Sequence, residues 1–288
     1  MSIDKLHDKI RKMKNPSMLD LTAAADAIPA HIDQGSAVEN YAFFCRELMN
    51  GLKDSMPAVR FRFDAFALMG GEGLAALSAL MQEAQDLGYY VLLDAPGILT
   101  PEDAQMTADT IFGGEAFPCD GLLISPYIGS DAIKPFLSYC KADKDLYVVV
   151  RSANKTAMEL QDLMTGTRLV HTAAMDIVNR HGETIFGKNG YSRVCAVVSA
   201  GAPNSIRAIR SGYKFTYLLV DGLEYPSGNH KNCSYAFDRF GYGAVVCAGT
   251  SITAAWKENG TDGTDFVAQA VEAADRMKKN LQRYVTIL

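Results

Sequence analysis

The chain has 288 residues, 48% of them hydrophobic, with a formal net charge of −5 and an isoelectric point near 5.6. This length is ample for one large core, and α/β barrels of this size are commonly one domain. Because no basic run stands out, we expect neither nucleic acid nor an anionic membrane surface as a partner.

Six cysteines lie far apart and form no Cys-x-x-Cys pair, so we interpret them as reduced thiols in the core of a cytosolic protein. They are Cys45, Cys119, Cys140, Cys195, Cys233 and Cys247. The N-terminal stretch MSIDKLHDKIRKMK is charged, and no apolar signal-peptide region follows it. No run of about 18 apolar residues is present to span a membrane. We therefore expect a soluble, cytoplasmic protein.

Short apolar runs alternate with helical patterns along the chain. A first helix opens at Ser2 and is stopped by Asn15-Pro16. The predicted strands are 16–22, 57–63, 89–94, 120–125, 146–152, 193–199, 214–220 and 244–248. The predicted helices among them are 36–56, 71–88, one starting at Thr100, 130–141 capped by Ser130, 156–182, 204–211, and 264–283 capped by Thr264. Strict alternation implies a parallel sheet. Eight units imply an α/β fold of the (β/α)8 TIM-barrel type, a single domain over residues 1–288 with an N-terminal helix.

In such a barrel, the residues that follow the strands face the active site. At these positions the sequence places polar and charged residues, namely Asp20, Thr22, Arg60, Arg62, Asp94, Ser125, Tyr127, Arg151, Ser152, Ser199, Asp221, Glu224 and residues 247–250. Asp94 is the most suggestive, because the apolar run 89–93 ends there and a helix start, Thr100-Pro101-Glu102-Asp103, follows.

Each charged group at this edge also has a structural interpretation. Asp94 either serves an active site or pairs with Arg60. Arg60, Arg62 and Arg151 either bind an anion or neutralise nearby aspartates, namely Asp94, Asp20 and Asp221.

Two further features at this edge point less clearly to chemistry. The spacing of Asp221, Glu224 and His230 matches no established metal site, so we predict none. No positioned base accompanies Cys247, which favours a core thiol. The turn 249–251 still offers backbone N–H groups to an anion.

Several longer segments resemble the orotidine 5′-phosphate decarboxylase family, in its longer bacterial, clostridial form. They are MSIDKL…NPSMLDL, IPAHI, PAVRF followed by GGEGLAAL, VLLDA, SPYIGSDAIKPF, ELQDL, YSRVCAVVSA and GYGAVVCAGTSI. SPYIGSDAIKPF is the most specific of these. The resemblance covers about residues 1–285. It implies a dimeric (β/α)8 barrel that removes CO2 from orotidine monophosphate without a metal or organic cofactor.

The same resemblance implies that most of the family's catalytic residues are replaced in this chain. Asp94 matches the first Asp of the family's Asp-x-Lys-x-x-Asp motif. The Lys that protonates the carbanion falls on Pro96, and the second Asp falls on Leu99. The second-strand Lys falls on Arg60, and the substrate-binding Asp of the first strand falls on Thr22.

The substrate contacts are altered as well. The Ser expected to read the pyrimidine falls on Ala153, although Ser152 stands beside it. The phosphate-binding Gln and Arg fall on Pro226 and Thr250. Because Asp221 and Glu224 lie nearby and acids repel a phosphate, we expect no phosphate ligand.

Three functions remain open. The first is a pseudoenzyme, an inactive homologue kept as a binding or regulatory protein. The second is an enzyme acting on a different small molecule, with Asp94 and either Arg60 or Arg151 in its site. The third is the decarboxylase of uridine monophosphate biosynthesis itself. In each case we expect a cytoplasmic homodimer without cofactor or metal, with a small-molecule ligand and no nucleic-acid or membrane partner.

Overall fold

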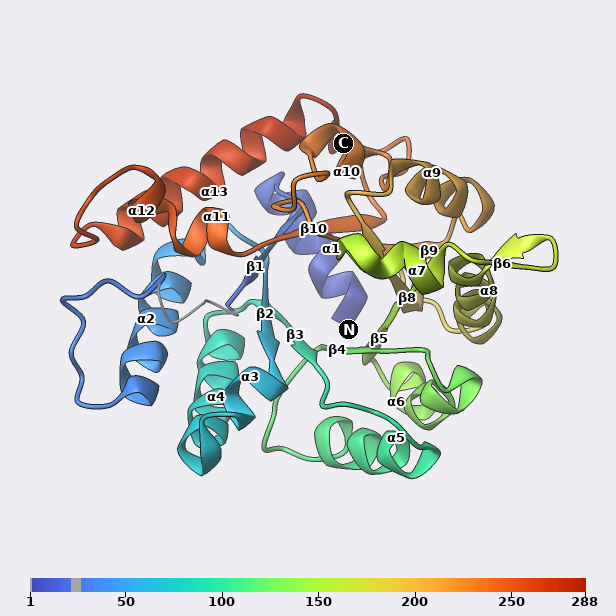
Figure 1. Ribbon diagram of the computed structural model, residues 1–288, viewed down its shortest axis with the longest axis horizontal. Coiled ribbons are helices and arrows are strands. Elements are labelled where there is room, and N and C mark those ends of the chain that lie inside the picture. Colours follow the sequence, from blue (N-terminus) through green and yellow to red (C-terminus); the bar gives the residue numbers. More distant parts are fainter. Residues whose placement is uncertain (1, 22–26) are drawn as a thin grey trace.

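Eight parallel strands close into a barrel in a computed structural model that describes residues 2–21 and 27–288 (Figure 1). The strand order around the barrel is β1-β10-β9-β8-β5-β4-β3-β2. The predicted TIM barrel is therefore confirmed, and the described strands lie within three residues of their predicted bounds. The barrel strands are β1 Ser17–Asp20, β2 Ala58–Arg62, β3 Tyr90–Asp94, β4 Gly121–Ile124, β5 Asp145–Val149, β8 Ser192–Ser199, β9 Thr216–Asp221 and β10 Ala244–Ala248.

Helices surround the barrel (Figure 1). They are α1 Ser2–Met13, α2 Ala37–Leu52, α3 Phe63–Ala67, α4 Gly70–Asp86, α5 Pro101–Thr107, α6 Leu137–Lys141, α7 Met158–Gln161, α8 Val170–Gly182, α9 Pro203–Gly212, α10 His230–Ser234, α11 Thr250–Thr253, α12 Ala255–Glu258 and α13 Phe266–Gln282. A π-helical turn, Ala108–Phe112, continues α5. No helix in the described part of the chain is long and apolar enough to cross a membrane.

Helix α1 closes the N-terminal end of the barrel. Its apolar face, with Ile3, Leu6 and Ile10, is buried. Its polar side chains bind the segments that precede the strands: Lys5 Nζ lies 2.9 Å from Asp120 Oδ2, just before β4. The opposite end, where the strands finish, is the end at which TIM barrels carry their active sites.

The helix predicted at 130–141 is broken in the structure. Two 3₁₀ turns, Gly129–Ala132 and Lys134–Phe136, precede the short α6. Pro135 has no N–H to donate and disfavours a continuous α-helix here. Ser130 does not cap a helix, and its hydroxyl instead lies 3.2 Å from Arg180 Nη2.

The predicted helix 156–182 is also divided. A 3₁₀ turn, Lys155–Ala157, leads into α7, and a hairpin of β6 Met164–Thr165 and β7 Arg168–Leu169 then precedes α8. Gly166 makes the hairpin turn with a φ of +65°, a backbone conformation that favours glycine.

Two predicted helix caps have different outcomes. Thr100 caps α5 as predicted: its hydroxyl accepts from Asp103 N, and the Asp103 carboxylate accepts from Thr100 N. Thr264 does not cap α13, which begins two residues later. Its hydroxyl lies 2.7 Å from Asp262 Oδ1.

All six cysteines are free and buried, as the sequence predicts for core thiols. Burial raises the pKa of Cys45, Cys119 and Cys233 to about 12, so these groups remain thiols at neutral pH.

One buried carboxylate was not anticipated from the sequence. Asp145 begins β5 and is fully buried. Tyr90 donates its hydroxyl to Oδ2 at 2.8 Å, while Oδ1 has no hydrogen-bond partner among the described residues. Burial raises the pKa of Asp145 from an ordinary 3.8 to about 8.

The shifted pKa makes the fold sensitive to pH. Because the folded state binds a proton that the unfolded state releases near pH 4, Asp145 favours folding at low pH, and this contribution falls as the pH rises toward 8. Asp145→Asn lacks this titration. We therefore expect its free energy of unfolding, relative to wild type, to rise with pH between 5 and 8, by up to about 1.4 kcal/mol per pH unit.

Urea unfolding at several pH values measures this difference. Asp131→Asn, at an exposed residue that pairs with Lys134, is the matched control. A difference between Asp145→Asn and wild type that stays constant with pH would contradict the prediction.

Candidate functional site

A cavity of about 460 Å³ lies at the mouth of the barrel, where the strands end. It is lined by Asp20 of β1, Arg62 of β2, the segment 152–154 after β5, the segment 221–225 at and after β9, and residues 247–250 at the end of β10. Asp20, Arg62, Ser152, Asp221, Glu224 and residues 247–250 are among the positions that the sequence predicts for a site.

Arg60 is tied into an ion-pair cluster beneath this cavity. Its guanidinium is 4% exposed and forms a two-pronged pair with Asp94, at 2.7 Å from Nε to Oδ1 and 2.6 Å from Nη2 to Oδ2. Its Nη1 lies 3.1 Å from Asp221 Oδ2 and 3.6 Å from Asp20 Oδ2. The structural interpretation of Arg60 is therefore the one observed, and all of its nitrogens face protein groups.

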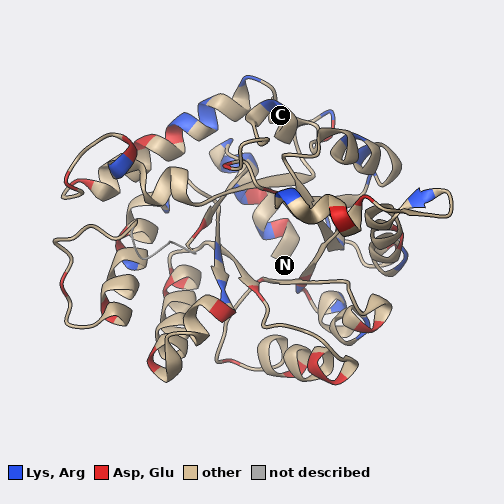
Figure 2. Ribbon diagram, viewed as in Figure 1, with Lys and Arg blue, Asp and Glu red and all other residues tan. Residues whose placement is uncertain are grey.

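The register of the strands builds this cluster. Asp20 pairs with Arg60 across β1 and β2, and Arg62 pairs with Asp94 across β2 and β3. Each cation of β2 thus has an acidic residue opposite it on a neighbouring strand. Figure 2 shows the blue stretches along the β2 ribbon.

The ionisation of the cluster follows from its burial and its charges. Burial opposes the charge on Arg60, but Asp94 and the other acidic groups around it together outweigh burial and hold the pKa of Arg60 above its usual range. Burial raises the pKa of Asp94, and Arg60 opposes that shift. Arg62 adds a longer contact of 3.4 Å to Asp94 Oδ2. Two cations thus face three carboxylates, so the mouth has no surplus positive charge.

Glu224 fills the anion-binding turn at the end of β10. Its carboxylate accepts from the backbone N–H groups of Gly249 at 2.9 Å, Thr250 at 3.2 Å and Ser251 at 2.7 Å. The hydroxyls of Thr250 and Ser251 also contact it. The sequence indicates that this turn can receive an anion, and in the structure the anion is a side chain of the same chain.

Arg151 lies outside the mouth cluster, and the prediction that it neutralises the mouth aspartates is wrong. Its Nε and Nη2 form a fork with the carboxylate of Asp162, at 2.9 and 3.0 Å. Asp162 immediately follows α7. The sequence predicts this segment as part of one long helix, so it does not indicate that Asp162 lies beside Arg151.

The predicted serines divide between two places. Ser152 lines the mouth, but its hydroxyl is already bonded to Asn154 Oδ1 and Gln161 Nε2, each at 2.7 Å. Ser125 lies apart, in a second cavity beside α8.

The other predicted positions of the mouth add no catalytic group. Leu99 is 79% exposed, and neither Leu99 nor Pro96 lines the mouth cavity. Thr22 lies outside the described residues. Burial raises the pKa of Cys247 well above its usual range, so its thiol is not ionised as a nucleophile would be. Among the described residues, no three His, Cys, Asp or Glu side chains are grouped to hold a metal ion.

No family model matches the chain. It is 23% identical to the orotidine 5′-phosphate decarboxylase of Caldicellulosiruptor bescii over 98% of both chains. It is 26% identical to that of Clostridium acetobutylicum over 98% of this chain and 100% of the relative. Among solved structures, the Leishmania donovani OMP decarboxylase superposes with a TM-score of 0.72 at 21% identity, covering 97% of this chain and 100% of that one. The Plasmodium berghei enzyme gives a TM-score of 0.76 at 15% identity, covering 97% and 99%. These two structures share the fold.

Glu224 provides a test of the occupied turn. In Glu224→Ala, the N–H groups of residues 249–251 lose their acceptor, and we expect a lower melting temperature that millimolar inorganic phosphate restores in part. The wild type should show no such gain, because its own carboxylate fills the turn.

Thermal unfolding with and without phosphate, at constant ionic strength, measures this effect. Glu272→Ala, at an exposed position on α13, removes the same charge elsewhere and is the control. Equal phosphate responses in wild type and Glu224→Ala would contradict the prediction.

Proposed function

We propose that this chain is a pseudoenzyme that binds a small molecule and does not decarboxylate orotidine monophosphate. It belongs to the orotidine 5′-phosphate decarboxylase family on 22–28% sequence identity to family members over 90–98% of its length. The observation that carries the proposal is the buried Arg60–Asp94 fork, together with the absence of an ammonium group among the described residues that line the mouth.

The missing proton donor is the first argument. Loss of CO2 leaves a carbanion that must receive a proton, and a positioned acid contributes orders of magnitude to such a step. The family Lys falls on Pro96, and the described residues that line the mouth include no lysine. Arg60 does not replace it, because a guanidinium held by Asp94 with a pKa above its usual range does not release a proton at neutral pH.

The charge of the mouth is the second argument, and it concerns the ligand. A phosphate would need the turn 249–251, which Glu224 occupies, and it would approach Asp20 and Asp221. The cavity of about 460 Å³ is within the range of small-molecule sites. We therefore propose a polar ligand of nucleoside size that carries no phosphate.

Turnover and binding assays test this proposal. Purified protein should release no CO2 from orotidine monophosphate above buffer, measured over hours at high enzyme concentration. Uridine monophosphate should likewise give no shift in melting temperature that depends on mouth residues, because neither a free anion-binding turn nor a surplus cation in the mouth receives its phosphate.

Asp221→Asn removes one mouth carboxylate, and Asp131→Asn is the matched control on an outer helical turn. Turnover clearly above buffer would refute the pseudoenzyme. A shift by uridine monophosphate that changes in Asp221→Asn and not in Asp131→Asn would refute the exclusion of phosphate.

We also propose that the chain is a homodimer joined across the barrel mouths. Large apolar side chains are exposed on the loops that follow the strands, as expected of a surface covered in an assembly. They include Leu68 at 89%, Leu99 at 79% and Tyr127 at 80% exposure. Residues of and after α7 add Met158, Leu160, Leu163 and Met164.

Analytical ultracentrifugation should therefore give about twice the chain mass of 31.3 kDa. The double variant Leu99→Glu/Tyr127→Glu places two charges in this surface and should yield monomers. Tyr284→Glu, at an exposed residue just after α13, should stay dimeric. A monomeric wild type, or a dimer that persists in the double variant, would contradict the interface.

A further inference from the structure

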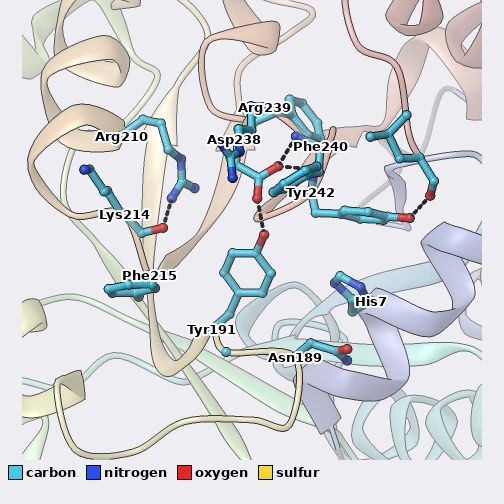
Figure 3. Close-up of a pocket in the computed structure, with 13 residues that line it drawn as sticks. His7, Asn189, Tyr191, Arg210, Lys214, Phe215, Asp238, Arg239, Phe240 and Tyr242 are labelled. Carbon is cyan, nitrogen blue, oxygen red and sulfur yellow. Dashed lines mark hydrogen bonds between the residues drawn. The ribbon is translucent and has the colours of Figure 1, made fainter.

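A third cavity, of about 860 Å³, lies at the opposite end of the barrel from the mouth. Figure 3 shows the side chains that line it. Its walls come from segments that precede strands: residues 189–191 before β8, residues 214–215 before β9 and residues 237–242 before β10. His7 of α1 completes the wall. Segments distant in the sequence thus converge on one hollow that has no part in the site described above.

Two charged side chains, Arg210 and Asp238, hold the walls of this cavity in place, and their hydrogen bonds are made within the protein. Arg210 donates to the backbone carbonyls of Ala236 at 2.6 Å, Gly243 at 2.7 Å, and Lys214 and Thr216 at 3.0 Å. It thereby ties α9 to the starts of β9 and β10. On the other side, Asp238 accepts from the Tyr191 hydroxyl at 2.6 Å.

The same carboxylate also orders the loop that carries the outer wall. Asp238 Oδ1 accepts from the backbone N–H groups of Phe240 at 2.8 Å and Tyr242 at 3.0 Å. With all of these bonds made inside the protein, the walls are preorganised, and neither Asp238 nor Arg210 needs a ligand to be satisfied.

Two further cations at the edge of the cavity are not bound to the protein in the way that Arg210 is. Lys214 and Arg239 are exposed, and no ion-pair partner for either is found in the described part of the chain. Arg239 lies over the ring of Phe240, 4.5 Å from its centroid. Among the charged side chains that line the cavity, the three cations Arg210, Lys214 and Arg239 face the single carboxylate of Asp238, which leaves a positive surplus of side-chain charge. Leu288, the last residue of the sequence, lies in the same wall.

Aromatic side chains provide flat surfaces between these cations. Tyr191, Phe215, Phe237, Phe240 and Tyr242 all line the cavity, and Phe215 is 63% exposed. The ring of His7 packs on Tyr242 with a centroid separation of 4.4 Å. His7 Nδ1 is buried and has no hydrogen-bond partner among the described residues, so one polar atom of the wall is unsatisfied.

We propose that this cavity is a binding site for a planar aromatic molecule that carries a carboxylate or phosphate group. Its ring would stack on the aromatic walls, and its anionic group would lie between Lys214 and Arg239. The size suits a ligand up to a nucleotide. The contrast with the mouth supports the assignment: there every cation is paired with a carboxylate, whereas here two cations are unpaired beside apolar surface.

Two matched probe pairs test the site by isothermal titration calorimetry. AMP against adenosine isolates a phosphate, and nicotinate against nicotinamide isolates a carboxylate. We expect at least one anion to bind tenfold more tightly than its neutral partner. The better anion identifies the group that the site prefers.

The double variant Lys214→Glu/Arg239→Glu should weaken that binding at least tenfold. It is expected to fold, because both side chains are exposed, and circular dichroism checks this. Phe215→Ala should weaken binding of the anion and its neutral partner alike, because it removes stacking and no charge. Lys279→Glu, at an exposed position on α13, is the matched charge control and should bind as wild type.

Asp221→Asn, in the barrel mouth, should also bind as wild type. This control separates the present site from the proposed function, so that either can fail alone. The proposal is overturned if neither anion binds at millimolar concentration, if the neutral partners bind as tightly, or if the double variant retains wild-type affinity.

Discussion

The pairing of Arg60 with Asp94 is the interaction on which the rest of the barrel mouth depends. A guanidinium that is almost fully buried must have its charge balanced, because an unpaired buried ion is several kcal/mol unfavourable. Asp94 supplies a two-pronged carboxylate, while Asp20 and Asp221 supply further negative charge from β1 and β9. Strands that are far apart in the sequence are thus joined across the barrel interior by one side chain.

This requirement restricts the chemistry of the mouth. Catalysis by electrostatics needs charges that are free to act on the reacting atoms and that are not already neutralised by each other. In the described mouth, Arg60 is held by Asp94, and the anion-binding turn of residues 249–251 is held by Glu224. A barrel whose polar groups bind each other can still enclose a polar ligand. It has little electrostatic free energy left to stabilise a transition state.

The parts of this structure that the sequence predicts well are those set by local patterns. Apolar runs bounded by turns locate all eight strands, and Thr100 with Asp103 forms the expected capping box. The errors occur where a local pattern is ambiguous. The stretch 156–182 has enough helix-forming residues to be predicted as one helix, yet the β6–β7 hairpin, which turns at Gly166, divides it.

That same error has consequences for the site. The hairpin region carries Asp162, which takes Arg151 away from the mouth. For Arg60, in contrast, its position at the end of a predicted strand already indicates a place at the mouth, and its pairing with Asp94 is one of the two interpretations that the sequence leaves open. The contact made by Glu224 was predicted only in part. The sequence placed it near the turn, but only the folded loop after β9 shows that its carboxylate reaches three successive N–H groups.

The cations at the two ends of the barrel are balanced in different ways. At the mouth, acidic residues outnumber the cations and neutralise them within the protein. At the other end, the inner charges, Arg210 and Asp238, are satisfied by the backbone and by Tyr191, and the outer cations have no carboxylate partner among the described residues. Residues at the N-terminal end of a TIM barrel usually serve stability. Here the bonds of Arg210 already tie the segments together, so Lys214 and Arg239 are not needed for that purpose. Unpaired cations beside exposed aromatic rings add little to folding, and recognition of an anionic ring accounts for both features at once.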